Sequence, residues 1–114
     1  MSDSAEAIVQ RQVDAYNTHD LDSFVSFYSP DAAYVRHADN SVLFEGHEAI
    51  REAYGALFQN HTNVHVEIAN RIVLGRFVID LEHITGRSDI AEMWVVAIYQ
   101  VADALIRKVW VLRS

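Results

Sequence analysis

Two acidic residues have the type and spacing for acid–base chemistry. Asp80 and Glu82 alternate with Ile79 and Leu81 in residues 77–86, FVIDLEHITG. In a strand, this alternation turns both carboxylates to one face, about 7 Å apart along the chain. If that face lines an apolar cavity, desolvation and like charge raise the pKa of one acid, which can then act near neutral pH. If the face is open to water, the two carboxylates are ordinary solvent-exposed surface groups. A one-residue change of register exchanges the two cases.

Length and charge limit the kinds of protein this can be. The 114 residues suit one domain over 1–114 with a single core. The formal net charge is −7 and the basic residues are scattered, so neither nucleic acid nor an anionic membrane is an expected partner. No apolar run could span a membrane and no signal-peptide pattern opens the chain, so we expect a cytoplasmic protein. Without cysteine, disulfides and thiolate chemistry are excluded.

Apolar periodicity predicts three helices in the first half of the chain. The first covers about residues 4–17, where Val9, Val13 and Tyr16 recur at helical spacing. The second covers residues 20–28, with Asp20 as a good N-cap and Pro30 just beyond its end. The third begins after Gly46 and runs to about residue 60.

Strand patterns fill the remainder. A hairpin of two short strands is expected at 32–38 and 42–46, and four long strands at 64–74, 76–86, 91–101 and 104–112. In the strand at 64–74, alternation would place these apolar residues on one face: Val64, Val66, Ile68, Ile72 and Leu74. The order ααββαββββ predicts an α+β fold, in which helices cover a curved, mostly antiparallel sheet.

The two faces of this sheet are both apolar. In residues 91–101, Met93 and Val95 alternate with Trp94 and Val96. Three helices can cover only one face, so we expect a homodimer packed sheet against sheet, because large exposed apolar patches are rare on monomers. The alternative is that the additional apolar residues fill a tight core within one chain.

The chain resembles the nuclear-transport-factor-2-like superfamily over essentially its whole length. The resemblance rests on IVQRQVDAYNTHDLDSFVSFYSPDAAYV, then FEGHEAIREAY, then four long strands. This superfamily includes ketosteroid isomerases and SnoaL-like polyketide cyclases, and its cystatin-like α+β fold hosts both enzymes and non-catalytic modules. The resemblance implies a cone-shaped half-barrel with a deep, largely apolar pocket between the sheet and the helices.

Comparison with this superfamily also implies which residues face the pocket. It turns Asp80 and Glu82 inward, together with Arg36 from the first strand. Arg36 would satisfy one carboxylate with paired hydrogen bonds, and the pKa of the other would rise. The ligand-binding residues that it implies are Tyr16, Tyr28, Tyr34, Tyr54 and Phe58.

Ketosteroid isomerase chemistry is not expected from the same comparison. Those enzymes use an Asp base, with a Tyr and a protonated Asp as the oxyanion hole. In this chain the base position falls at Arg36, the Tyr position at Gln12 and the Asp position near Ala97. A guanidinium cannot accept a proton, so the catalytic set of those enzymes is absent.

The function expected from the sequence is binding of a small, mostly apolar organic molecule in an enclosed pocket. If the protein is an enzyme, we expect cofactor-free acid–base catalysis of the isomerase, cyclase, dehydratase or hydrolase type. Asp80 or Glu82 would be the acid or base, and Arg36 would orient the substrate. No metal site is expected, because the six histidines match no ligand pattern; His37 is a secondary acid–base candidate. The alternative is a non-catalytic ligand-binding or dimerisation module.

Overall fold

The order of helices and strands agrees with the prediction. The computed structural model describes residues 4–113, and the order within them is ααββαββββ. The helices are α1 (Ala5–Asn17), α2 (Leu21–Ser26) and α3 (His47–Asn60). The strands are β1 (Tyr28–Arg36), β2 (Val42–Glu45), β3 (His65–Leu74), β4 (Phe77–Thr85), β5 (Glu92–Ala102) and β6 (Leu105–Arg113). In residues 4–113, no helix is both long and apolar enough to cross a membrane.

Side-chain caps fix where the first two helices begin. Ser4 accepts a hydrogen bond from the Ala7 N–H, and Asp20 accepts one from Ser23. The second helix ends two residues earlier than its pattern predicted. The Ile106 N–H donates to the Phe27 carbonyl at 2.8 Å, which draws the chain onto β6 and starts β1 at Tyr28.

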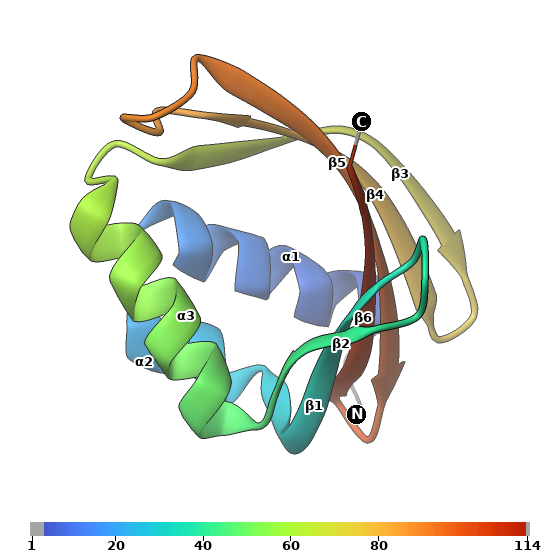
Figure 1. Ribbon diagram of the computed structural model, residues 1–114. Coiled ribbons are helices and arrows are strands. Elements are labelled where there is room, and N and C mark those ends of the chain that lie inside the picture. Colours follow the sequence, from blue (N-terminus) through green and yellow to red (C-terminus); the bar gives the residue numbers. More distant parts are fainter. Residues whose placement is uncertain (1–3, 114) are drawn as a thin grey trace.

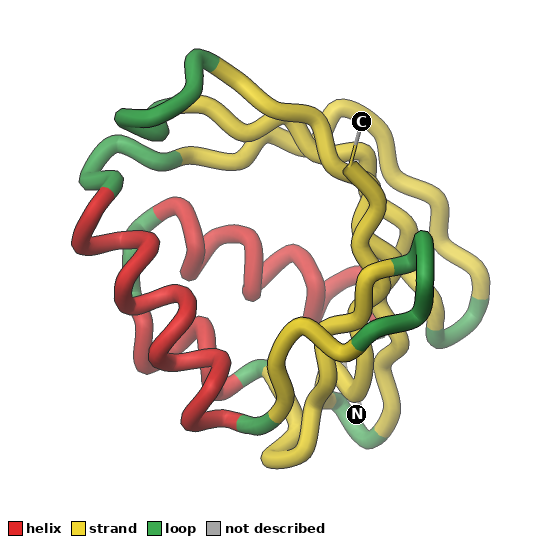
Figure 2. Tube along the Cα trace, in the orientation of Figure 1, coloured by secondary structure: helices red, strands yellow, loops and turns green. Residues whose placement is uncertain are grey.

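The six strands form one curved sheet in the order β2-β1-β6-β5-β4-β3. All neighbouring strands are antiparallel except β1 and β6, which are parallel. Figure 1 shows the sheet curling around α1, with α2 and α3 on the open side, and Figure 2 shows that the helices all lie on the concave side. The predicted fold class, an α+β half-barrel with a mostly antiparallel sheet, is confirmed.

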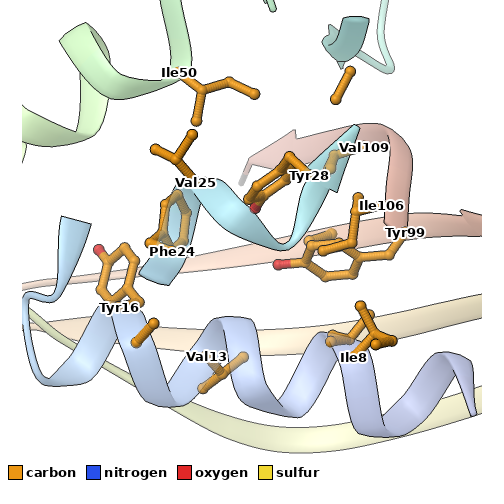
Figure 3. Close-up of a cluster of buried hydrophobic side chains, with 14 of the residues drawn as sticks. Ile8, Val13, Tyr16, Phe24, Val25, Tyr28, Ile50, Tyr99, Ile106 and Val109 are labelled. Carbon is orange, nitrogen blue, oxygen red and sulfur yellow. The ribbon is translucent and has the colours of Figure 1, made fainter. Parts of the chain in front are cut away.

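A single apolar core fills the space between the helices and the concave face, which we call the inner face of the sheet. Figure 3 shows side chains from α1, α2, α3 and the strands gathered in this core, among them Val13, Phe24 and Ile50. Asn17 ties the end of α1 to the sheet, because its amide accepts from the Val66 N–H at 2.8 Å and donates to the Val66 carbonyl at 2.9 Å.

One extra residue in β3 changes which side chains face inward. Ile68 pairs with Glu82 but Asn70 pairs with Leu81, so Ala69 forms a bulge. The expectation that Ile72 and Leu74 share the face of Val66 was therefore wrong. They lie on the outer face, 55% and 71% exposed, and Arg71 takes the inner face opposite Asp80.

Candidate active site

The two carboxylates of β4 lie on the inner face of the sheet. Asp80 is completely buried and Glu82 is 8% exposed, on the same face as Val78. Ile79 and Leu81 alternate with them on the outer face. The register therefore places both acids in the interior, against the helices, and not in solvent.

Asp80 forms a paired ion bridge with Arg71. The Arg71 Nε donates to Asp80 Oδ1 at 2.7 Å and the Arg71 Nη2 donates to Oδ2 at 2.9 Å. The remaining guanidinium nitrogen donates to Gln10 of α1 at 2.8 Å, with Glu6 3.9 Å away. The hydrogen bonds to Asp80, with the negative charges of Asp80 and Glu6, raise the pKa of Arg71. Asp80 is therefore fully engaged by a cation that also joins β3 to α1.

Glu82 has no such cation. Its carboxyl accepts one hydrogen bond from the Tyr99 hydroxyl, at 2.9 Å. Burial raises the pKa of Glu82 to about 7, and the negative charge of Asp80 adds to the effect, while the Tyr99 hydrogen bond and Arg71 oppose it. A carboxyl group with this pKa can donate or accept a proton near neutral pH.

Arg36 does not meet these acids. It lies at the exposed end of β1, and its guanidinium pairs with Asp39 of the following turn at 3.5 Å. In the sheet order, β6 and β5 separate β1 from β4, so the Arg36 and Asp80 backbones lie three strand spacings apart, about 14 Å. The strand order shows that the expected pairing of Arg36 with Asp80 or Glu82 does not form. Arg71, not Arg36, is the cation that pairs with Asp80.

The sequence did contain a signal for Arg71. Gly75 and Arg76 form the two-residue turn between β3 and β4, and counting outward from such a turn pairs residue 71 with residue 80. The apolar alternation in residues 64–74 indicated a different register, because it looks regular across Ala69, where the bulge shifts the pairing. Tyr99 was also missed, since its apolar neighbours on β5 indicated only a buried strand.

The tyrosine hydroxyls form a hydrogen-bonded chain beside Glu82. Tyr28 donates to Gln12, which leaves Tyr34 to donate to Tyr28, and Tyr54 bonds to Tyr34 in turn. Burial raises the pKa of all four of Tyr28, Tyr34, Tyr54 and Tyr99. These phenols therefore stay protonated at neutral pH and can act as hydrogen-bond donors.

A cavity of about 130 Å³ lies between the helices and the inner face of the sheet. Three of the expected tyrosines line it, Tyr16, Tyr34 and Tyr54, together with Tyr99 and apolar side chains such as Ile84 and Val95. Within residues 4–113, Glu82 is the one carboxyl group in this lining.

Two residues expected to bind a ligand lie outside this lining. Tyr28 is fully buried behind Tyr34, and Phe58 packs edge-on against Tyr16 with ring centroids 5.4 Å apart. Asp80 is also outside the lining. The two acids of β4 therefore have different surroundings. Glu82 lines the cavity, whereas Asp80 lies outside the lining and pairs with Arg71.

The Arg71–Asp80 pair can be tested by its effect on stability. Arg71→Met leaves Asp80 buried without its cation, so we expect it to lower the free energy of unfolding by about 3–5 kcal/mol. Removing both charges, as Arg71→Met with Asp80→Leu, should restore most of that loss. Urea unfolding measures both, and Arg76→Met in the exposed β3–β4 turn is the matched control, expected within about 0.5 kcal/mol of the parent. A loss for Arg71→Met no larger than that control would contradict the assignment.

The raised pKa of Glu82 predicts how stability depends on pH. The folded protein binds this proton more tightly than the unfolded chain, whose carboxyl has a pKa near 4.5. The contribution of Glu82 to stability is therefore fully present below that pH and is lost as pH rises through about 7. Relative to Glu82→Gln, the parent should lose about 3 kcal/mol across this window. Denaturation series at several pH values would measure the difference, in which the unchanged groups cancel. A difference that stays constant with pH would mean that Glu82 titrates normally.

Comparisons with known proteins agree with this fold. Among solved structures, an uncharacterized cystatin-fold protein from Novosphingobium aromaticivorans is 27% identical with a TM-score of 0.90, over 98% of this chain and 100% of that chain. A candidate polyketide cyclase from Sinorhizobium meliloti is 19% identical with a TM-score of 0.80, over 93% and 94%. A hypothetical protein of ketosteroid isomerase-like fold from Catenulispora acidiphila, in complex with trimethylamine, is 19% identical with a TM-score of 0.78, over 94% and 85%.

Among proteins with curated descriptions, none matches this sequence significantly. A family model described as a SnoaL-like domain matches residues 9–109, which is most of the chain. The chain therefore belongs to the SnoaL-like family, within the nuclear-transport-factor-2-like superfamily.

Proposed function

We propose that the Glu82 cavity is an active site for proton transfer on a small, mostly apolar organic molecule, without a cofactor. The observation that carries the proposal is the position of Glu82, a carboxyl group with a pKa of about 7 in the lining of the cavity between the helices and the sheet. Perturbed acids in enclosed cavities are typical of catalytic sites.

The surrounding residues have distinct roles in this proposal. Tyr99 orients the Glu82 carboxyl through its hydrogen bond. Asp80 and Arg71 are positioning residues that hold β4 against β3 and α1. Tyr16 lines the same cavity, and its hydroxyl can donate to an oxyanion that develops as Glu82 removes a proton. Isomerisation, aldol-type cyclisation and dehydration all include such a step.

The size of the cavity limits the substrate. Its volume of about 130 Å³ is below the range of ~300–1,000 Å³ that is typical of drug-sized ligands. It is close to the ~150 Å³ engineered cavity that holds benzene. The part of the substrate that enters the cavity is therefore about one six-membered ring in size. The trimethylamine complex of the Catenulispora acidiphila protein supports this scale, since a related fold there binds a molecule of only a few atoms.

A non-catalytic ligand-binding module is the second candidate. Two observations favour it: the cavity is small, and its polar groups already have partners. Glu82 accepts a hydrogen bond from Tyr99, and the buried tyrosines hydrogen-bond to one another. The two candidates differ in whether Glu82 exchanges a proton with the bound molecule.

Deuterium exchange distinguishes the two candidates. Cyclohexanone is a ring of suitable size with acidic protons beside a carbonyl, and in D₂O its exchange is followed by proton NMR. We expect the protein to accelerate exchange and Glu82→Gln to reduce the acceleration by about 10²–10⁴-fold. The control is Glu92→Gln, which changes a glutamate that bonds His83 on the other face of the sheet and should leave the rate unchanged. Cyclohexanone that binds in the cavity without faster exchange would favour the binding module.

We also propose that two copies of the chain pair through the outer face of the sheet. Its support is a patch of exposed apolar side chains on adjacent strands, namely Ile72, Leu74, Leu81, Trp94 and Leu112, each at least 36% exposed. Patches of this kind are uncommon on monomers.

The pairing is tested by the mass of the particle in solution. Light scattering after gel filtration should give a dimer for the parent and a monomer for Leu81→Glu, since a charge at this position would be buried in the interface. Val42→Glu, at an apolar site on β2 that is 58% exposed, is the control and should remain dimeric. A parent that is monomeric at all concentrations would refute the pairing.

A further inference from the structure

The chain is acidic overall, yet one surface hollow is lined by basic side chains. This hollow has a volume of about 430 Å³ and lies where the β1–β2 hairpin meets the end of β6. Arg36, His37 and Arg113 line it together with apolar residues, and no acidic residue among residues 4–113 does. A local positive potential in a chain of net charge −7 favours an anion at this place.

The hollow adjoins the Glu82 cavity. Leu43, Val111 and Arg113 belong to the lining of both. A molecule that enters the cavity past these three residues therefore passes Arg113. Within the described part of the chain no acid lines the hollow, so the proposed chemistry remains at Glu82.

The register of the sheet places Arg113 in the same row as Glu82. Glu82 pairs with Val95 on β5, and Val95 pairs with Arg113 on β6. Glu82 and Arg113 are thus two strand spacings apart, about 10 Å between backbones, on the same face. Their side chains can approach a small molecule in the cavity from opposite ends.

Arg113 is the basic group in this region that is ready to bind an anion. Arg87, which also lines the cavity, is occupied by Asp89 through two hydrogen bonds of 2.7 and 2.9 Å. Arg36 has Asp39 at 3.5 Å. Among residues 4–113, no carboxylate lies within ion-pair distance of Arg113.

We propose that the cavity takes a small monocarboxylate, whose carboxylate pairs with Arg113 at the mouth and whose apolar body lies beside Glu82. A guanidinium offers two parallel donors that match the two oxygens of a carboxylate. The volume limits the apolar body to about one benzene ring. This inference rests on the proposed function, because it assumes that the Glu82 cavity is the binding site.

Benzoate and benzamide test the inference, since they share a ring and differ in charge. Titration of each at about pH 6, followed by protein NMR, gives both affinities under conditions where Glu82 is largely protonated. We expect benzoate to bind at least about tenfold more tightly than benzamide. Arg113→Gln should remove this preference by weakening benzoate at least about tenfold while leaving benzamide unchanged. The control Arg76→Gln changes an arginine in the β3–β4 turn, outside both linings, and should keep the preference.

The remaining outcomes separate this inference from the proposed function. If benzoate and benzamide bind the parent equally, or if Arg113→Gln leaves the preference intact, the carboxylate inference is wrong and the proton-transfer proposal stands. If neither compound binds to the parent, the cavity does not accept a ring of this size and both proposals fail.

Discussion

The buried pair between Arg71 and Asp80 is the interaction on which the site depends. A carboxylate as deeply buried as Asp80 requires a cation with good hydrogen-bond geometry, and Arg71 supplies it with two short bonds. The same guanidinium reaches Gln10, so that one ion pair holds β3, β4 and α1 together. Because Arg71 is committed to Asp80, Glu82 is left with a single phenol as its partner, and burial raises its pKa to about 7. Two acids that are alike in sequence thereby acquire different properties.

The local pattern of the sequence was sufficient for the order of helices and strands, and the resemblance to the superfamily supplied the half-barrel and the inward orientation of Asp80 and Glu82. Helical spacing of residues such as Val9 and Val13 located α1, and alternation across Asp80 and Glu82 gave the correct pairing of side chains on β4. The partner of Asp80 was not predicted, for two physical reasons. The order of strands in the sheet depends on long-range pairing, which put Arg36 too far from β4. In addition, the bulge at Ala69 reverses the faces of β3 in the middle of an apparently regular strand.

Family membership establishes the architecture, and the particular side chains limit the chemistry. Gln12 and Ala97, which the resemblance to ketosteroid isomerases matches to polar catalytic positions, are both buried, and Gln12 accepts a hydrogen bond at the end of the tyrosine chain. The cavity is small and its only described acid is Glu82. In the function that we propose, the site selects by size, by charge through Arg113 at its mouth, and by the position of one exchangeable proton. These three constraints arise from different elements: α3 and the sheet set the size, β6 the charge and β4 the acid.

The central claim is that Glu82 exchanges its proton near neutral pH because it is buried without a cation of its own. The most direct test is an NMR titration of the glutamate side-chain carboxyl carbons, with Glu82 assigned by its loss in Glu82→Gln. Our account predicts a midpoint of about 7 for Glu82. A midpoint near the ordinary value of 4.5 would contradict it, because Glu82 would then be ionised at neutral pH like a surface carboxylate.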